Sequence, residues 1–308
     1  MRKNSKYYFA TTANACNRRS FNLPVPLLPA QLSILLFAFL FVSLGSQNGH
    51  ASSTDGYNTS QRVISTNVCI DNILINMFDI KHVVAVSNLV DDPRYSQVKF
   101  LDQKIERISF DAEQILGLRP SIVLISNFSN QRVVRILQKS GTKIITVPYA
   151  TQFSQLTENI RIIGTAIKQN KKAKQLIKKI NQQIDRTATH TDKFALHVTS
   201  NNYIYGKNSL ISDAIRHAGF SAFDASGFGE SHGFVSTESI IASKPDYLIT
   251  DKIHTVNNFV SSKDRYHPAL GTAYPTQNRI YVDPKLWSCA HQSTPQIIDI
   301  IKQGAHEK

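Results

Sequence analysis

Short apolar runs alternate with amphipathic stretches from residue 62 onward, and the apolar runs are continuous rather than interrupted by polar positions. A strand buried on both faces gives such a run, whereas a half-exposed strand alternates apolar and polar residues. Buried strands that are each followed by a helix are typical of a parallel sheet covered by helices. In the first half we predict strands at 63–65, 83–86, 122–125 and 144–147, and helices at 71–78, 112–118, 132–140 and 155–167.

One long amphipathic helix is predicted over residues 168–186, because its apolar residues recur at steps of three and four. The alternation of strands and helices restarts after this helix. The pattern therefore predicts two α/β halves joined by a single long helix. In the second half we expect strands at 194–198, 247–250 and 280–282, and helices at 209–217, 239–243 and 295–302.

The N-terminus carries a basic segment without acidic residues, followed by an apolar run of 13 residues at 32–44. This run is shorter than the roughly 20 residues that span a bilayer, and it fits the hydrophobic region of a signal peptide cleaved after Ala51. The alternative is an uncleaved signal anchor. No cysteine stands at the cleavage site, so we expect no lipid anchor there, whereas Arg18 and Arg19 leave Sec and twin-arginine export both open.

The predicted segments follow from these patterns. They are a signal peptide (1–51), a flexible polar leader (52–61), an N-terminal α/β lobe (62–167), a linker helix (168–190) and a C-terminal α/β lobe (191–308).

The chain is basic, with 35 Lys and Arg against 22 Asp and Glu, which gives a net charge of +13. Removing residues 1–51 removes five of the basic residues and leaves 30 against 22, an excess of eight. Six lysines of this excess lie on the linker helix, where a lysine-rich helix is usually a solvated face. We therefore expect no nucleic-acid partner. With 42% apolar residues and three cysteines, the chain is globular and is not a disulfide-rich scaffold.

An internal repeat relates the two halves. Glu113 and Glu238 each stand two residues after a candidate helix N-cap, Asp111 or Ser236, and seven residues before a proline that leads into a buried strand. An acid in the first turn of a helix stabilises it by about 0.3–1 kcal/mol, which accounts for either glutamate alone. Two at matching sites also place one carboxylate on each lobe, where the pair suits a two-fold symmetric partner.

Several segments occur in a recognisable order: RVISTNVCID at 62–71, the Glu113 block, the linker helix, KNSLISDAIRHAG at 207–219, the Glu238 block and LWSCAH at 286–291. In order and spacing they resemble the periplasmic substrate-binding proteins of ABC importers, in the helical-backbone class that includes cobalamin, ferric-siderophore and haem binders. The resemblance covers nearly all of residues 62–305. It implies an α/β fold of two Rossmann-like lobes with parallel sheets, joined by one long rigid helix, with the ligand cleft between the lobes.

The resemblance also implies a function. Such a protein captures an iron chelate (a siderophore or haem) or cobalamin in the periplasm and delivers it to a dimeric membrane permease with ATPase subunits. In that family one glutamate on each lobe docks against permease arginines, and the matching positions are Glu113 and Glu238. No catalytic activity, resident cofactor or structural metal is expected.

Cleft positions carry over from the family by alignment. They are Cys69, Ser126, Asn127, Phe128, Tyr203, His232, Ser288, Cys289 and His291. The residues leave three outcomes open for Cys69 and Cys289: buried unpaired thiols, a disulfide, or a metal site with His232 or His291. Of the last two the disulfide is favoured, because no close Cys or His spacing marks a metal motif.

The identity of the ligand stays open. Cobalamin binders of the family tend to line the cleft with tryptophans, and Trp287 is the one tryptophan of this chain. Many haem binders offer an axial tyrosine, a role that Tyr149, Tyr203 or Tyr205 can fill. Many siderophore binders use Arg or Lys against an anionic chelate, and the carried-over cleft positions contain neither.

Two other functions need testing. The segment GESHG at 229–233 matches the G-x-S-x-G elbow of α/β-hydrolases, with Ser231 as nucleophile, Asp246 or Asp251 as acid, and His267 or His291 as base. The elbow requires a strand directly before the serine and a helix directly after it. The second alternative is an importer receptor for a bare metal ion, which needs at least three His or carboxylate ligands that converge; the candidates are His82, His197, His232, His254, His267 and His291.

Overall fold

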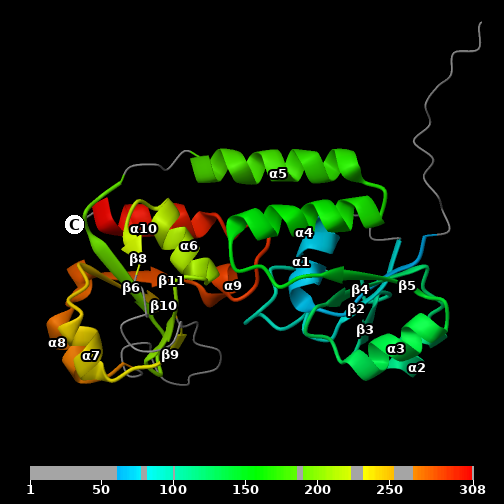
Figure 1. Cartoon of the computed structure of the whole chain (residues 1–308), viewed down its shortest axis with the longest axis horizontal. Coiled ribbons are helices and arrows are strands. Elements are labelled where there is room, and N and C mark those ends of the chain that lie inside the picture. Colours follow the sequence, from blue (N-terminus) through cyan, green and yellow to red (C-terminus); the bar gives the residue numbers. More distant parts are fainter. Residues whose placement is uncertain are drawn as a thin grey trace, which may run out of the picture. The chain divides into compact units, whose positions relative to one another are not determined.

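The sheet of the N-terminal lobe has five parallel strands in the order β3–β2–β1–β4–β5 (Figure 1). The strands β1 and β4 lie at its centre and are fully buried, which explains their continuous apolar sequences. The edge strand β3, a Glu-Arg-Ile segment, was not predicted because it lacks an apolar run. The bounds are β1 (Val63–Ser65), β2 (Val83–Ser87), β3 (Glu106–Ile108), β4 (Ile122–Ser126) and β5 (Lys143–Val147).

Helices cover both faces of this sheet. Successive strand residues point to opposite faces, so that Val63 packs in one apolar cluster with α1 and α4, and Ile64 packs in a second cluster with α2 and α3. The predicted βαβ layering of this lobe is therefore confirmed. The bounds are α1 (Val68–Met77), α2 (Ala112–Gly117), α3 (Gln131–Lys139) and α4 (Phe153–Ala166).

The second lobe has a four-stranded parallel sheet in the order β11–β10–β6–β8 and a separate antiparallel pair, β7 and β9. Helices α6 and α10 pack on one face of the larger sheet, and α7 and α8 pack on the other. The strands are β6 (Phe194–Val198), β7 (Tyr203–Tyr205), β8 (Ser221–Ala222), β9 (His232–Phe234), β10 (Tyr247–Asp251) and β11 (Arg279–Val282). The helices are α6 (Leu210–His217), α7 (Thr237–Ala242), α8 (Pro268–Ala273), α9 (Pro284–Trp287) and α10 (Gln296–His306), with a 3₁₀ turn η4 (Thr276–Asn278).

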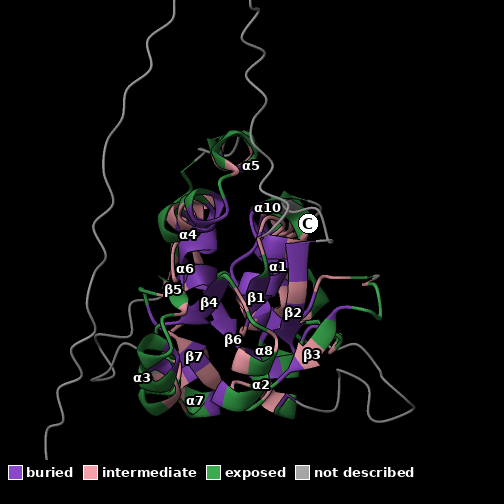
Figure 2. Cartoon of the chain, turned by 90° about the vertical axis from the view of Figure 1, so that its right-hand side faces the viewer, coloured by how far each residue is buried: buried purple, intermediate pink, exposed green. Residues whose placement is uncertain are grey.

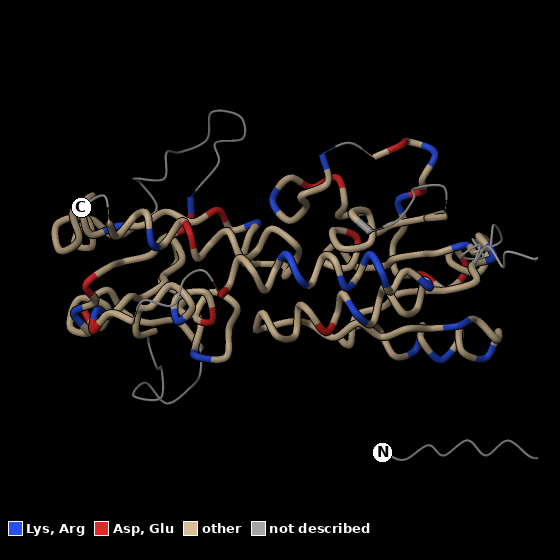
Figure 3. The backbone as a smooth tube through the Cα atoms, turned by 90° about the horizontal axis from the view of Figure 1, so that it is seen from above, with Lys and Arg blue, Asp and Glu red and all other residues tan. Residues whose placement is uncertain are grey.

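The linker helix α5 (Asn170–Asp185) begins two residues later than predicted. Helix α4 ends at Ala166, and Lys168 has a φ of 59°, in the left-handed region, which interrupts the helical backbone. Two residues of α5, Ala173 and Ile180, are buried, whereas its outer side is exposed (Figure 2). Lys and Arg residues, like Asp and Glu residues, occur along both halves of the described chain (Figure 3).

The structure is a computed structural model that describes residues 61–77, 82–99, 101–185, 190–222, 232–252 and 266–306. The predicted signal peptide and nearly all of the leader lie outside these residues, as do Ser231, His254 and the side chain of His232. None of the helices in the described part is both long and apolar enough to cross a membrane.

Candidate functional site

A cleft of about 380 Å³ is lined by residues from both lobes, at the carboxyl ends of the parallel strands. Ligands in open α/β sheets bind at this edge, because the loops that follow the strands converge there. Phe128 follows β4, Tyr149 follows β5, and Trp287 lies on α9. No charged side chain is among the described residues of the cleft wall, which also includes Thr151, Tyr203, Tyr205, Gly206, Asn208, Ser209, Leu210 and Ile211.

Aromatic rings form a continuous row along the second lobe. Phe234 contacts Tyr203 with ring centroids 5.1 Å apart, and Tyr203 contacts Tyr205 at 5.0 Å. Tyr205 contacts Trp287 at 4.9 Å, and Trp287 contacts the buried ring of His197 at the same distance. Each of these pairs is T-shaped, the edge-to-face geometry that aromatic rings favour. The wall of the cleft is thus a preformed aromatic surface.

A polar network beneath this row holds Trp287 in place. The indole Nε1 of Trp287 donates to Oδ1 of Asp251 over 3.2 Å, and Nε2 of His197 lies 3.1 Å from the same oxygen. His197 is 2% exposed, whereas the Asp251 side chain is part-buried, at 14% exposure. The network fixes the orientation of the indole ring, because a part-buried carboxylate retains its hydrogen-bond donors strongly.

Two tyrosines of the cleft, Tyr149 and Tyr205, are neutral phenols. Burial raises the pKa of Tyr149, and burial followed by the neighbouring Tyr203 raises the pKa of Tyr205. Tyr149 is still 44% exposed, and its hydroxyl donates across the cleft to the carbonyl of Ser288 over 3.5 Å. These hydroxyl groups can therefore donate hydrogen bonds to a ligand or, after losing a proton, coordinate a metal centre that the ligand carries.

A disulfide joins Cys69, at the start of α1, to Cys289, two residues after α9, with Cα atoms 5.0 Å apart. This pairing answers the question that the sequence left open for the two thiols, and it removes both from metal ligation. Cys69 also lines a small cavity beside the cleft, together with Ser126 and Tyr149. The bond therefore connects the two lobes next to the candidate ligand site.

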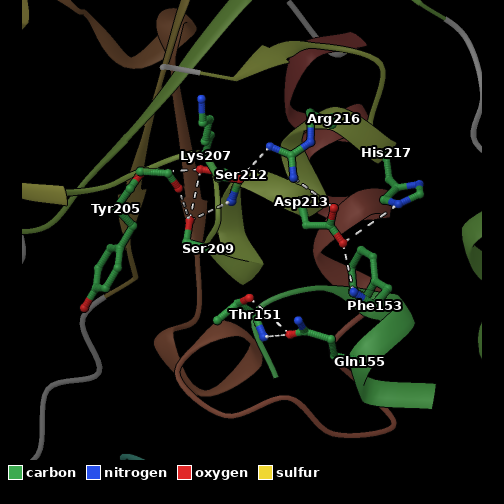
Figure 4. Close-up of polar contacts among 11 residues, drawn as sticks. Thr151, Phe153, Gln155, Tyr205, Lys207, Ser209, Ser212, Asp213, Arg216 and His217 are labelled. Carbon is green, nitrogen blue, oxygen red and sulfur yellow. Dashed lines mark hydrogen bonds and ion pairs between the residues drawn. The ribbon is translucent and has the colours of Figure 1, made fainter. Parts of the chain in front are cut away.

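A second link between the lobes is a helix cap (Figure 4). The backbone N–H of Phe153, at the first turn of α4, donates to Oδ2 of Asp213 on α6 over 2.8 Å. Arg216 donates to the other carboxylate oxygen over 3.0 Å. The side chain at the N-cap position, Gln152, makes no capping bond, so Asp213 of the other lobe supplies it. The carboxylate fixes the start of α4 relative to the second lobe.

The predicted docking glutamates are exposed and lie in the first turns of α2 and α7. Asp111 accepts from Gln114 N over 3.0 Å, and Ser236 accepts from Ser239 N over 3.1 Å, which confirms the two predicted N-caps. The pKa of Glu238 is lowered by a hydrogen bond from its own backbone N–H and by the Ser236 hydroxyl. In Figures 1 and 2, α2 and α7 both lie on the side of the molecule opposite α5.

Comparison with known proteins shows which family has this architecture. The family model described as periplasmic binding protein matches residues 63–286, which include both sheets and the cleft. The chain belongs to the periplasmic binding protein family.

Its relatives within and around this family are distant in sequence. An ABC transporter substrate-binding lipoprotein of Bacillus subtilis strain 168, YvrC, itself uncharacterized, is 24% identical over 220 residues, which are 66% of this chain and 66% of that protein. A possible iron-binding, periplasmic solute-binding protein of Staphylococcus epidermidis ATCC 12228 superposes with a TM-score of 0.64 at 20% identity, covering 79% of this chain and 98% of that one.

Two solved structures from Vibrio cholerae share the fold. A periplasmic haem-binding protein gives a TM-score of 0.63 at 17% identity and covers 79% of this chain and 98% of its own. A periplasmic vitamin B12-binding protein gives 0.62 at 15% identity, with 80% and 97% covered. At these identities the likeness shows the two-lobed fold of the periplasmic binding protein and leaves its ligand open.

The other carried-over positions have different places in this binding protein. Phe128, 77% exposed, and Tyr203 line the cleft. Ser126 accepts from Phe128 N, and Asn127 accepts from Tyr149 N over 2.9 Å, so these two side chains shape the loops after β4 and β5. Ser288 contributes its carbonyl to the contact with Tyr149.

Two histidines complete the set of positions. His291 is fully buried, its Nε2 bonds the carbonyl of Lys285 over 2.9 Å, and its Nδ1 accepts from Ser293 N. Desolvation by burial lowers the pKa of His291. The ring is thus neutral and buried, and it is held by hydrogen bonds with backbone groups. The backbone of His232 lies in β9, opposite Tyr205, and its side chain is outside the described residues.

Tyr149 and Tyr205 were predicted only as possible axial ligands of a haem, and Trp287 was noted only as the one tryptophan. The polar residues Asn208 and Ser209 were not predicted to line the cleft. The place of Tyr149 directly after the predicted strand β5 was a usable signal, because parallel strands present their following loops at one edge. Asn208 and Ser209 follow β7, a three-residue strand that the pattern did not predict.

The hydrolase interpretation conflicts with the backbone of this binding protein. The candidate Ser231 lies outside the described residues, but β9 begins directly after it, pairs antiparallel with β7, and precedes α7. A nucleophile elbow has the opposite order, with the strand before the serine. The proposed partners are also in use: Asp246 accepts from Phe194 N over 2.7 Å, and His267 caps α8.

The bare-metal interpretation lacks a ligand cluster in the part of the chain that the structure describes, where no three His, Cys, Asp or Glu side chains come together. His197 pairs with Asp251, and His291 is engaged with backbone groups. His82 is buried, 5% exposed, in the first lobe.

Proposed function

We propose that this periplasmic binding protein is the solute receptor of an ABC importer, and that it captures an iron chelate (a siderophore or haem) or cobalamin in the cleft. The observation that carries the proposal is the aromatic cleft between two parallel-sheet lobes, whose described lining residues carry no charge. The protein delivers its ligand intact to a permease driven by separate ATPase subunits, and it catalyses no reaction. Residues 1–51 direct its export to the periplasm.

The chemistry of the cleft favours a large ligand with an apolar face. Phe128 in the cleft wall is 77% exposed, and Phe234, which contacts the cleft residue Tyr203, is 73% exposed; such exposed aromatic side chains offer an apolar surface to a partner. Each aromatic contact is worth about 0.5–1.5 kcal/mol beyond the area that it buries. A small hydrated ion gains nothing from such a wall. A strongly anionic chelate lacks the Arg or Lys that would neutralise it among the described cleft residues.

Among the candidate ligands, this wall favours a planar metal tetrapyrrole. The phenol of Tyr149 or Tyr205 can coordinate its metal once the metal displaces the proton, because a bound cation lowers the pKa of a coordinating group. Titration with haemin, cyanocobalamin and several ferric siderophores tests this, followed by the fluorescence of Trp287 and by haemin absorbance. Trp287 is the one tryptophan, so its emission reports on the cleft directly. Failure of all of these ligands to bind would refute the ligand class.

Matched tyrosine variants locate the site. Tyr149→Phe is expected to weaken binding of a ligand that uses the phenol by about tenfold, the equivalent of one hydrogen bond to a charged or metal centre. Tyr281→Phe is the control, because Tyr281 is 39% exposed on β11 and does not line the cleft. Equal losses in the two variants would contradict the assignment of the cleft.

Permease docking rests on Glu113 and Glu238. Both are exposed on short helices of the same side of the molecule, one on each lobe, which suits a two-fold symmetric permease. Reversing both charges, Glu113→Arg with Glu238→Arg, is expected to abolish uptake and leave ligand affinity unchanged. Glu106→Arg, at an exposed position of the edge strand β3, is the control. Uptake that survives the double reversal would refute the docking role.

A further inference from the structure

The two lobes are connected covalently at two separate places. The first is the backbone, which passes from one lobe to the other along α5. The second is the Cys69–Cys289 bond, whose cysteines are 220 positions apart in the sequence. Two bodies that are joined at one place can rotate relative to each other about several axes. A second joint leaves only rotation about the line that passes through both joints. The disulfide therefore removes most of the relative motions that a linker helix alone would permit.

The bond lies where such a restriction acts on the candidate ligand site. Cys289 is two residues from Trp287, and Cys69 shares a cavity with Tyr149, which belongs to the opposite wall of the cleft. The Tyr149 hydroxyl reaches the carbonyl of Ser288, the neighbour of Cys289. Both walls of the cleft are thus held within a few residues of the disulfide.

Apart from the disulfide and the backbone, the described links between the lobes are noncovalent, and they include an apolar cluster that contains residues of α4 and α6 as well as two hydrogen bonds. The contact between Tyr149 and Ser288 is 3.5 Å long, at the limit of a hydrogen bond. The cap from Asp213 to Phe153 N is shorter, but a single hydrogen bond contributes about 0.5–1.5 kcal/mol and opens readily. Only the disulfide holds the separation of the walls without opening thermally.

We propose that the Cys69–Cys289 disulfide is an interlobe lock that holds the cleft in its ligand-binding shape, and that reduction converts the protein to a form with lower affinity. This inference rests on the proposed function for its ligand, although the lock itself has a test without ligand. Preorganisation raises affinity because the protein does not lose conformational freedom when it binds.

The chemistry of the switch follows from exposure. Cys69 is half-buried beside a cavity, whereas Cys289 is 3% exposed. A thiolate of a dithiol reductant attacks Sγ of Cys69, and Cys289 leaves as a thiolate. The second thiol of the reductant then resolves the mixed disulfide, so the reductant becomes a disulfide and the protein gains two electrons and two protons as two thiols.

The size of the effect depends on how often the unlocked cleft adopts the binding shape. If the reduced protein does so about one tenth of the time, the apparent Kd rises about tenfold. Coupling is reciprocal, so a bound ligand should shift the equilibrium between dithiol and disulfide toward the disulfide by the same factor.

The first test uses the exported protein without ligand. Peptide mapping under non-reducing conditions should recover a peptide pair joined through Cys69 and Cys289. Hydrogen exchange is then compared before and after reduction and removal of the reductant. Faster exchange confined to residues 126–130, 148–153 and 286–291, with β1, β4, β6 and β10 still protected, is the result expected of a lock. Absence of the linked pair, unchanged exchange, or a uniform loss of protection over both sheets would each overturn the proposal.

The second test measures affinity, with haemin and cyanocobalamin as probes. Reduced protein should bind the probe that oxidised protein binds with a Kd about tenfold higher, and reoxidation should restore the affinity. The variant Cys69→Ser with Cys289→Ser should show the weakened Kd under all conditions, which controls for side effects of the reductant. An unchanged Kd would overturn the affinity switch. If neither probe binds the oxidised protein, the assignment of a metal tetrapyrrole as the ligand fails, while the exchange result still decides the lock.

Discussion

Replacing Asp71 by Asn should remove a pH dependence of folding stability that the wild-type protein carries. Asp71 is fully buried on α1, and its Oδ2 accepts from Ser87 N over 3.1 Å and from Ser87 Oγ over 2.6 Å. Burial nevertheless dominates and raises the pKa of Asp71 from 3.8 to about 7, while hydrogen bonds from Ser65 and Ser87 lower it in part. The folded protein therefore keeps a proton on Asp71 that the unfolded chain releases above pH 4.

The sign and magnitude follow from linkage. Between about pH 4 and 7 the folded state binds more protons than the unfolded state, so the free energy of unfolding falls as pH rises. Each unit of pKa shift corresponds to about 1.4 kcal/mol, so a shift of about three units gives a loss of about 4 kcal/mol from pH 4 to above pH 7. The stabilising contribution is present in full below the unfolded pKa, is lost as pH rises through the folded pKa, and changes little above it.

The assay is urea unfolding at pH 4 to 8, followed by circular dichroism, for the wild type and Asp71→Asn. The difference in unfolding free energy between the two proteins isolates the titration of Asp71, because other groups titrate in both. Asp91→Asn is the control: hydrogen bonding to Arg107 lowers the pKa of that exposed carboxyl, so its smaller effect has the opposite sign. A difference between wild type and Asp71→Asn that stays constant within about 1 kcal/mol across this range would refute the reasoning.

Three further predictions concern stability and are read out by chemical unfolding. The double change Cys69→Ser with Cys289→Ser should lower the unfolding free energy by up to about 5 kcal/mol, the chain-entropy value for a closed loop of 220 residues, and an equal stability of oxidised and reduced wild type would contradict it. Trp287→Phe should lower the unfolding free energy by about 1–3 kcal/mol, because the part-buried Asp251 loses a hydrogen-bond donor. Circular dichroism must be the probe, since this variant lacks the fluorophore. A change below 0.5 kcal/mol, about the smallest that one hydrogen bond contributes, would argue against the network. Ser236→Ala should cost about 1 kcal/mol by removing the N-cap of α7, Ser236→Asp should retain the cap, and equal losses in both variants would exclude capping as the cause.

The binding proposal and the lock act on the same few residues. Trp287 and Tyr149 both line the cleft. Trp287 is two residues from Cys289, and Tyr149 lines the same small cavity as Cys69. A variant that changes affinity therefore needs the ligand-free exchange measurement beside it. A change in the cleft wall alters affinity alone, whereas loss of the disulfide alters both affinity and the exchange of residues on both walls.

The sequence by itself determined the elements that repeat a strong local pattern. Strands β1, β6 and β10 were predicted within one residue, because strands buried on both faces show as continuous apolar runs. The N-caps of α2 and α7 were predicted from local residues as well, since capping involves side chains only three positions away. The boundary between α4 and α5 was predicted between residues 167 and 168, and the structure ends α4 at Ala166 and begins α5 at Asn170, with a left-handed residue at Lys168 between them.

Tertiary structure alone decided the site. The order of apolar and polar residues does not show that Tyr149 and Trp287, 138 positions apart, face one cleft, because strand order and loop direction bring them together. The sequence gives no measure of the distance between Cys69 and Cys289, which the packing of α1 against the loop after α9 sets at 5.0 Å between Cα atoms. His291 stands in a segment aligned with the cleft, yet backbone partners turn its ring inward. Contacts between residues distant in the chain depend on the whole fold, and local patterns do not encode them.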